Sequence, residues 1–145
     1  MNSLLLGLLG AVCWGLAPVF GKLGLRDLSP SDGLIARSLV TLSVIAVWAA
    51  VSGRYQHLRF IAAKDWLYLG LEAFFATLAG DLAYYAALKA GSAGITAVLL
   101  SAAPIFTLWA GNLWLTESYS TLQLAGTFLV VAGIMLVAAG SGPVH

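Results

Sequence analysis

An acidic residue, Asp81, lies inside a long apolar run that covers about residues 66–88. A carboxylate is costly in apolar surroundings, and one that is kept there usually has a function. Thr77 and Tyr85 lie four positions to either side of Asp81, and residues at that spacing share one face of a helix. We therefore expect a polar stripe on which Asp81 can bind a substrate or exchange a proton.

A second charge, Arg37, lies near the start of another apolar run, about residues 34–51. If successive helices alternate in direction, four side chains come to similar depths, to within about 6 Å given the errors in helix boundaries. These are Trp14, Arg37, Asp81 and Ser101. We predict that they line one substrate chamber. The alternative is that Arg37 and Asp81 form an ion pair whose role is only structural.

Two prolines, Pro18 and Pro104, fall inside apolar runs. A proline inside a helix cannot donate to the carbonyl four residues back, and it kinks the helix. The carbonyls freed in this way belong to Trp14 and Leu100. Substrate sites are often found at interrupted helices, so both kinks are candidates for bordering a cavity. The alternative is a structural kink whose free carbonyl is satisfied by a neighbouring Ser or Thr.

The composition places these residues in a lipid bilayer. Of the 145 residues, 61% are hydrophobic and 9% are charged, and the mean hydropathy is +0.95. Soluble domains carry about 25% charged residues, and disordered chains need low hydrophobicity and high charge, so both classes are excluded. Five apolar runs stand out, at about residues 3–21, 34–51, 66–88, 93–115 and 121–139.

Each run is long enough to cross about 30 Å of hydrocarbon as a helix. The runs are continuously apolar and do not alternate, which favours helices over a β-barrel. The sequence therefore predicts an all-α integral membrane protein, a single domain over residues 1–145 with five transmembrane helices. Lys22 and Lys89 lie near the ends of runs, where lysines can reach the membrane surface.

Two polar segments carry helix-start signals. Residues 29–33 read SPSDG, in which side-chain oxygens can cap a new helix. Ser120 is followed three residues later by Gln123, which is the pattern of a capping box.

The last apolar run carries a repeat of small residues. Gly126, Gly133 and Gly140 each follow an alanine and lie seven positions apart. Small residues allow close approach of membrane helices, and a seven-residue period gives a left-handed crossing. We predict a packing or dimer seam here; the alternative is the general Gly and Ala richness of membrane helices.

Several classes of function lack support in the sequence. The net charge is +1 with no basic run, which gives no electrostatic basis for binding nucleic acid. The single Cys13 offers no metal cluster. No paired catalytic carboxylates and no nucleophile with a base appear, and His57 and His145 lie without partners in a loop and at the terminus. We expect neither an enzyme nor a cofactor.

The charges in the loops do not fix the orientation of the chain. Three basic residues fall on one side of the predicted spans, namely Arg54, Arg59 and Lys64. The other side has Lys22, Arg26 and Lys89, with Arg37 as a fourth. Because the two sides are nearly balanced, the positive-inside rule does not predict an orientation. Such a chain could insert both ways and pair as an antiparallel homodimer with dual topology, which corresponds to the inverted repeats of many transporters.

The sequence also resembles a known family. The resemblance covers about residues 4–140 and is carried by YYAALKAGSA at residues 84–93 and LLSAAP at residues 99–104, together with Trp14-Gly15, Arg37, Glu117, QLAG at residues 123–126 and Ala132-Gly133. It is a resemblance to the EamA domain of the drug/metabolite transporter superfamily. The resemblance implies a five-helix half-transporter, in which four helices line a substrate cavity and the fifth supports packing or dimerisation.

The resemblance also implies export or exchange of small metabolites, amino acids or drug-like compounds. Typical members carry two such repeats and this chain carries one, which favours a homodimer. We predict a secondary transporter of the cell membrane, in a prokaryote the inner membrane, that works by alternating access with Asp81 as the candidate for proton coupling. The alternative is a subunit or scaffold that stabilises a larger membrane complex without transporting.

Overall fold

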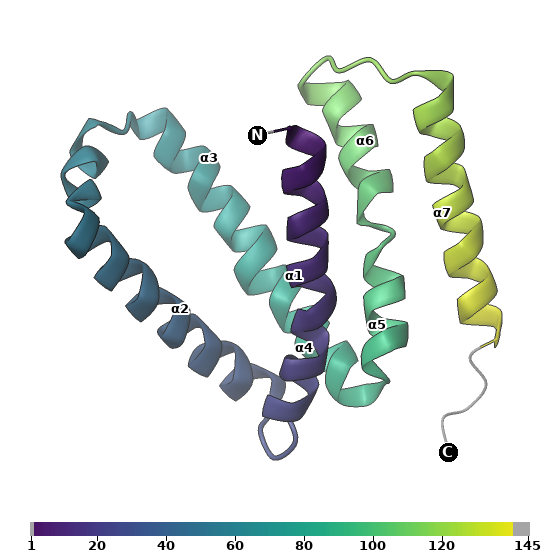
Figure 1. Cartoon of the computed structure of the whole chain (residues 1–145), viewed down its shortest axis with the longest axis horizontal. Coiled ribbons are helices and arrows are strands. Elements are labelled where there is room, and N and C mark those ends of the chain that lie inside the picture. Colours follow the sequence, from purple (N-terminus) through teal and green to yellow (C-terminus); the bar gives the residue numbers. More distant parts are fainter. Residues whose placement is uncertain (1, 141–145) are drawn as a thin grey trace. The chain divides into compact units, whose positions relative to one another are not determined.

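The computed structural model describes residues 2–140, and throughout this range the regular structure is helical, without a strand. Figure 1 shows the elements in chain order. They are α1 (Ser3–Gly24), α2 (Pro30–Ser52), the 3₁₀-helix η1 (Arg54–Phe60), α3 (Ala63–Ala73), the π-helix η2 (Phe74–Gly80), α4 (Asp81–Ala90), α5 (Ala93–Leu100), α6 (Ala103–Trp114) and α7 (Thr121–Gly140). The predicted all-α class is confirmed.

Four helical stretches are long and apolar enough to cross a membrane: Ser3–Gly24, Pro30–Ser52, Ala93–Trp114 and Thr121–Gly140. They correspond to four of the five predicted spans. The remaining predicted span, residues 66–88, is helical throughout but consists of α3, η2 and α4. It also contains Glu72 and Asp81, so a fifth span stays a prediction.

The caps that the sequence predicted form as expected. Ser29 accepts a hydrogen bond from the Asp32 backbone N–H at 3.1 Å, with Pro30 in the first turn. For this reason α2 begins at Pro30 rather than at the predicted residue 34. The Ser120 N–H donates to Gln123 Oε1 at 2.8 Å, and the Gln123 N–H donates to Ser120 Oγ at 3.3 Å. This is the predicted capping box.

The chain divides into two compact units, and each is described by itself. The central unit is Phe20–Ala90, and the terminal unit combines, among the described residues, 2–19 and 91–140. The prediction of one domain over residues 1–145 stays a prediction.

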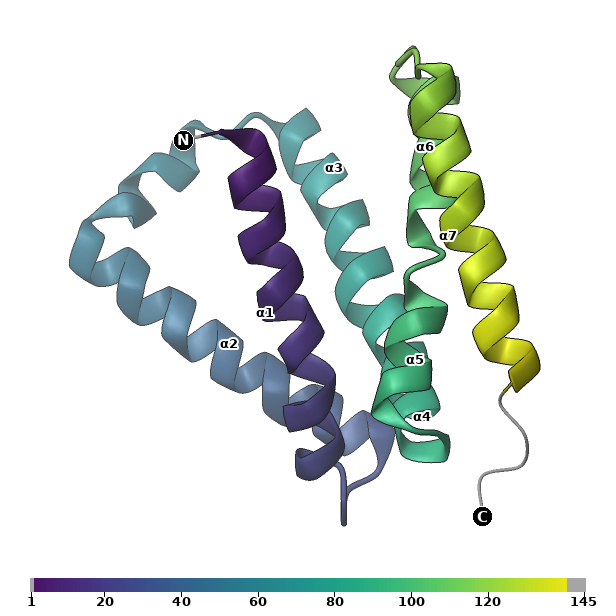
Figure 2. The same ribbon diagram turned by 45° about the vertical axis from the view of Figure 1, so that its right-hand side comes forward.

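The core of the central unit lies where α2 meets α4. The two helices are in contact, and α2 and α3 diverge from this end and are joined again through η1 (Figures 1 and 2). Leu25, Leu34, Tyr85 and Leu88 are buried here. Gly33 allows Leu25 and Tyr85 to pack closely against α2, because a Cβ at this position would overlap Leu25 and lie 3.3 Å from the Tyr85 ring.

Two lysines join the ends of α1 and α4 within the central unit. Lys22 Nζ donates to the Leu88 carbonyl at 2.6 Å. Lys89 Nζ donates to the carbonyls of Leu25 at 2.8 Å and Arg26 at 2.9 Å. The last carbonyls of a helix lack partners within it and attract cations. Lys22 therefore caps α4, and Lys89 binds the two carbonyls that directly follow α1, roles that the sequence did not predict.

Replacing Lys89 by Met should lower the free energy of unfolding by about 1–3 kcal/mol, because the variant leaves two carbonyls without their charged donor. Lys64→Met is the matched control, since Lys64 lies over the Tyr68 ring and exposed contacts of this kind contribute about 0.5–1 kcal/mol. Unfolding in mixed micelles measures both. Equal losses in the two variants would show that Lys89 does not join the helices.

The terminal unit contains a helix break that differs from the predicted kink. α5 ends at Leu100 and α6 begins at Ala103, so Pro104 lies in the first turn of a new helix. Since Pro104 cannot donate to Leu100, the chain tightens: the Ser101 N–H donates to the Val98 carbonyl at 3.1 Å, and the Ala102 N–H donates to Leu99 at 3.2 Å. Pro18, in contrast, lies within uninterrupted α1, and its kink stays a prediction.

Candidate functional site

The structure brings together the two charges that the sequence singled out. Arg37 on α2 and Asp81, the first residue of α4, form an ion pair with 2.6 Å between Arg37 Nη1 and Asp81 Oδ2. The side chains remain 45% and 16% exposed, respectively, within the chain. The pair is therefore formed and remains partly exposed within the chain. The geometry is consistent with both predicted roles, a binding site and a structural ion pair.

Tyr85 belongs to the same site. The guanidinium carbon of Arg37 lies 5.9 Å from the centroid of the Tyr85 ring, within the range of a cation–π contact. Tyr85 is itself buried against Gly33, so its ring is held by the packing of α2 on α4. Arg37 is thus oriented by Asp81 at one end and by an aromatic face beside it.

The π-helix η2 leads directly into Asp81. A Cβ at Gly80, the last residue of η2, would lie 2.7 Å from the Phe75 backbone oxygen, closer than real side chains come. Glycine is therefore required for this wider turn. Single π-turns are frequent at functional sites. The sequence analysis did not anticipate η2, and the signal available was a glycine immediately before an acid inside an apolar run.

Thr77 lies within η2 and is exposed. The stripe predicted for Thr77, Asp81 and Tyr85 assumed α-helical spacing, and this spacing does not hold through a π-helix. Tyr85 is placed at the ion pair by its contact with Arg37, whereas the role of Thr77 stays a prediction.

The other predicted residues lie in the terminal unit. Trp14 is on α1 and 80% exposed. Ser101 lies at the break between α5 and α6. The prediction that these two share a chamber with Arg37 and Asp81 stays a prediction.

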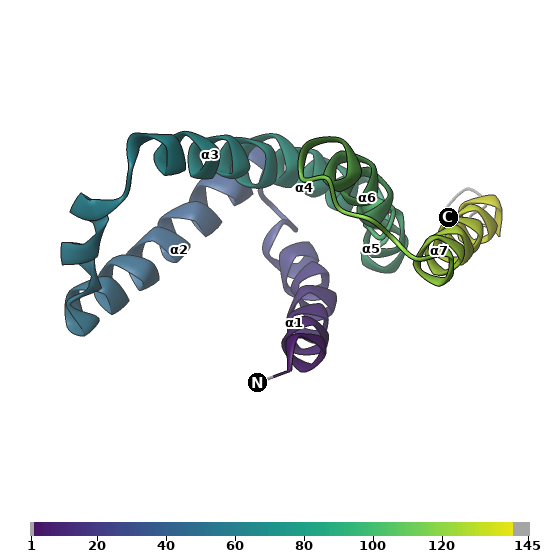
Figure 3. The ribbon, with the colours of Figure 1, turned by 90° about the horizontal axis from the view of Figure 1, so that it is seen from above.

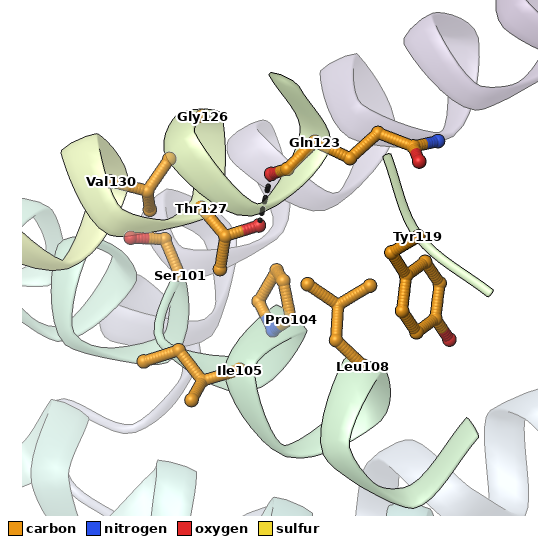
Figure 4. A pocket seen from close by; sticks show the side chains of 9 residues that line it. All are labelled: Ser101, Pro104, Ile105, Leu108, Tyr119, Gln123, Gly126, Thr127 and Val130. Carbon is orange, nitrogen blue, oxygen red and sulfur yellow. Dashed lines mark hydrogen bonds between the residues drawn. The ribbon is translucent and has the colours of Figure 1, made fainter. Parts of the chain in front are cut away.

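Ser101 lines a groove of about 400 Å³ between the α5–α6 break and α7 (Figure 4). The groove is mostly apolar, and its lining contains no charged side chain: Ser101, Pro104, Ile105, Leu108, Tyr119, Gln123, Gly126, Thr127 and Val130. The Thr127 hydroxyl donates to the Gln123 carbonyl at 3.0 Å, so it is already satisfied. The groove suits an apolar group rather than a charged one.

One end of the groove is held by the loop between α6 and α7. The Tyr119 hydroxyl donates to Glu117 Oε2 at 2.6 Å, and this hydrogen bond raises the pKa of Tyr119 above its ordinary value. The Glu117 N–H in turn donates to the Gly111 carbonyl at 3.2 Å. Seen from above, this loop links α6 and α7 while the helices lie apart (Figure 3).

The comparisons with known proteins decide the family. Residues 1–139 match the EamA-like transporter family. The chain belongs to that family. It is therefore a membrane transporter of the drug/metabolite transporter type, as the motifs at residues 84–93 and 99–104 predicted. Family membership also favours the predicted absence of enzymatic activity.

Two relatives of this EamA-like chain have its length. One is described as an uncharacterized transporter in the cobO 3′ region of a Sinorhizobium species, 34% identical over 90% of this chain and 92% of its own length. The other is an uncharacterized protein of Methanocaldococcus jannaschii, 27% identical over 94% of this chain and 96% of its own length. No solved structure matches the chain significantly.

The three glycines of the small-residue seam of this EamA-like chain have open space beside them, although Gly126 also lines the groove described above. Outside its own helix, no atom of the described structure lies within 4 Å of where a Cβ would stand at Gly126, Gly133 or Gly140. Whether the seam receives a helix of a second chain stays a prediction. Residues 2–140 also contain no cluster of three His, Cys, Asp or Glu side chains suited to a metal ion.

Tyr84 carries a buried hydroxyl that has no hydrogen-bond partner in the described structure. Such a hydroxyl costs about 1–3 kcal/mol when it is left unsatisfied. Tyr84→Phe should therefore leave the free energy of unfolding unchanged or raise it by up to about 1 kcal/mol, with Tyr68→Phe as the control on an exposed ring. A clear loss of stability in Tyr84→Phe alone, measured in mixed micelles, would show that the hydroxyl is bonded in the membrane.

Proposed function

We propose that the protein is a secondary transporter that exports or exchanges small metabolites, amino acids or drug-like compounds by alternating access. The Arg37–Asp81 ion pair carries this proposal, because it is a partly exposed pair of charges on two helices of a transporter-family chain. Charged residues inside membrane segments are rare and usually mark a pathway for substrates or ions.

Asp81 is our candidate for proton coupling. Arg37 is always charged, so the carboxylate is the member of the pair that can take up a proton. A proton on Asp81 would release Arg37, and binding of substrate would then compete with binding of the proton at one site. The position of Asp81 directly after η2 supports this role, because π-turns inside helices are frequently found at functional sites.

We further propose that two copies form the working unit in the cell membrane. The alignments cover 92% and 96% of the relatives, so these proteins also have the length of one five-helix unit. A second copy supplies the half that two-repeat transporters hold within one chain. The uncovered seam on α7 gives such a copy a place to pack. Both relatives come from prokaryotes, which supports the cell membrane as the location.

The balance of loop charges predicts that the chain inserts in both orientations. A reporter fused after the last residue should then give signal from both sides of the membrane. Signal from one side alone would exclude dual topology and leave a parallel dimer or a second, homologous chain as the partner.

The proposed function is tested by an unbiased uptake and efflux screen in reconstituted vesicles. The protein should move at least one compound class, and the Asp81→Asn protein should fail to move it. If the wild-type protein moves no compound and dissipates no proton gradient across a broad panel, the scaffold alternative is favoured instead.

A further inference from the structure

We propose that the surface around η1 binds the headgroups of anionic phospholipids. It consists of three basic side chains and the three aromatic rings that they contact: Arg54, Arg59, Lys64, Trp48, Phe60 and Tyr68. We call these six side chains the η1 surface. Lipid phosphates would bind the cations, and the adjoining acyl chains would contact the rings. This inference depends on the membrane location of the chain and not on the proposed transport function.

The position of η1 in the chain places it at the membrane surface. α2 is long and apolar enough to cross a membrane and ends at Ser52. η1 begins directly afterwards, at Arg54, and the chain turns there toward α3 (Figure 1). The residues that follow a membrane span lie among the headgroups, where aromatic and basic side chains gather. Lipid phosphates are therefore within reach of the η1 surface.

The cations of the η1 surface contact rings instead of carboxylates. The guanidinium carbon of Arg54 lies 5.8 Å from the centroid of the Trp48 ring, and that of Arg59 lies 4.8 Å from the centroid of the Phe60 ring. Lys64 Nζ lies 5.7 Å from its ring centroid. Within residues 2–140 none of the three side chains forms a salt bridge or donates a hydrogen bond. Since a ring face takes up no N–H donor, these donors stay open to phosphate oxygens.

The charge around η1 is complementary to an anionic headgroup. Residues 52–65 contain the three basic residues of the η1 surface and one acidic residue, Asp65. The other end of α2 differs, because Lys22 and Lys89 already bind backbone carbonyls there. The remaining cation at that end, Arg26, is followed directly by Asp27. Open positive charge is therefore concentrated at η1, and basic residues beside a span attract anionic lipids.

The exposed rings indicate a lipid rather than a soluble anion. Phe60 is 73% exposed within the chain, and Trp48 and Tyr68 are also exposed. Large apolar side chains next to basic ones lie at the boundary between headgroups and acyl chains. A soluble anion would pair with the cations and leave the rings uncovered. An anionic phospholipid provides a partner for both.

The test titrates phospholipids into the full chain in micelles of a neutral detergent. Phosphatidylglycerol, which is anionic, should raise the Tm, since a ligand that binds the folded state stabilises it. Phosphatidylcholine with the same acyl chains should raise the Tm less at every concentration. The difference between the two lipids should shrink as salt is added, because salt screens exposed charges. The concentration dependence of the Tm gives the apparent affinity.

Variants of the η1 surface should weaken the binding of phosphatidylglycerol. Arg54→Gln and Arg59→Gln should each lower the affinity about fivefold, which corresponds to about 1 kcal/mol for a basic residue near an anionic surface. Arg26→Gln is the matched control, because it removes the same charge from an exposed arginine at the other end of α2, and its affinity should equal that of the wild-type protein. The Tm of each variant without lipid checks its fold.

Three outcomes would overturn the inference. The first is an equal rise in Tm with both lipids in the wild-type protein, a comparison that needs no variant. The second is a loss of affinity in Arg26→Gln as large as in Arg54→Gln and Arg59→Gln, which would assign the attraction to the net charge of the chain. The third is an equal rise with soluble glycerophosphate or with a peptide of ten glutamates, which would make a soluble anion or an acidic protein the occupant. The vesicle screen decides the proposed function separately.

Discussion

In vesicles that contain the Asp81→Asn protein, proton-driven movement of substrate should fall about 30-fold or more while the protein remains folded. Asparagine keeps the size of the side chain but removes the charge, which leaves Arg37 without its partner. Removing one member of a charge pair at a binding site costs about 2–5 kcal/mol. Because Arg37 is 45% exposed, water screens part of this loss, and the lower end of about 2 kcal/mol gives the 30-fold estimate.

The double variant Arg37→Gln/Asp81→Asn separates transport from structure. Both charges are then absent, so neither is left without a partner, and stability should return toward the wild-type value although each single change lowers it. Transport should not return, because the groups that bind the substrate or the proton are missing. Initial rates in vesicles and unfolding in mixed micelles, measured for all four proteins, complete the cycle.

A double variant that transports at the wild-type rate would contradict our proposal and establish the ion pair as structural. This comparison is sharper than either single variant. A single change perturbs packing and chemistry together, and its loss of activity cannot be assigned to one of them. In the cycle, stability that returns in the double variant is attributed to the ion pair. Transport that does not return is attributed to the loss of the groups that bind the substrate or the proton.

The local features of the fold could be predicted from the sequence because they depend on residues three or four positions apart. The capping box of Ser120 and Gln123 is one example, and the cap at Ser29 is another. Arg37 and Asp81 could be selected in the same way, since a charge inside an apolar run is conspicuous. The contact between Arg37 and Asp81 depends on the packing of α2 on α4. The sequence placed the two residues at similar depths only to within about one helical turn.

Two features could not be predicted, because each depends on which carbonyl a backbone N–H selects. Pro104 was expected to kink one helix, but the chain instead turns tightly at Ser101 and begins a second helix. The π-helix η2 was expected to be ordinary α-helix. Hydrophobic periodicity reports the face that a residue occupies and is nearly unchanged by one wider turn. Gly80 becomes informative only when the position of the Phe75 carbonyl is known.

Gly80→Ala should therefore have one of the largest effects of any small substitution in the chain. The added methyl group would stand 2.7 Å from the Phe75 backbone oxygen, and a backbone atom cannot move aside as a flexible side chain can. The π-turn must open or rewind to α-helix. If the turn rewinds to α-helix, its extra residue passes into the next turn and everything beyond it rotates by about 100° around the helix axis, which carries Asp81 away from Arg37.

The same rotation displaces the buried Tyr85 and Leu88 from the core of the central unit. We expect Gly80→Ala to lose transport to the same extent as Asp81→Asn and, in addition, about 1–3 kcal/mol of stability from the forced repacking. Gly70→Ala is the matched control, since a Cβ at Gly70 in α3 meets no atom within 4 Å. Alanine there should stabilise the helix by about 0.5–1 kcal/mol. If Gly80→Ala behaved like Gly70→Ala in both measurements, the π-turn would have no part in presenting Asp81 to Arg37.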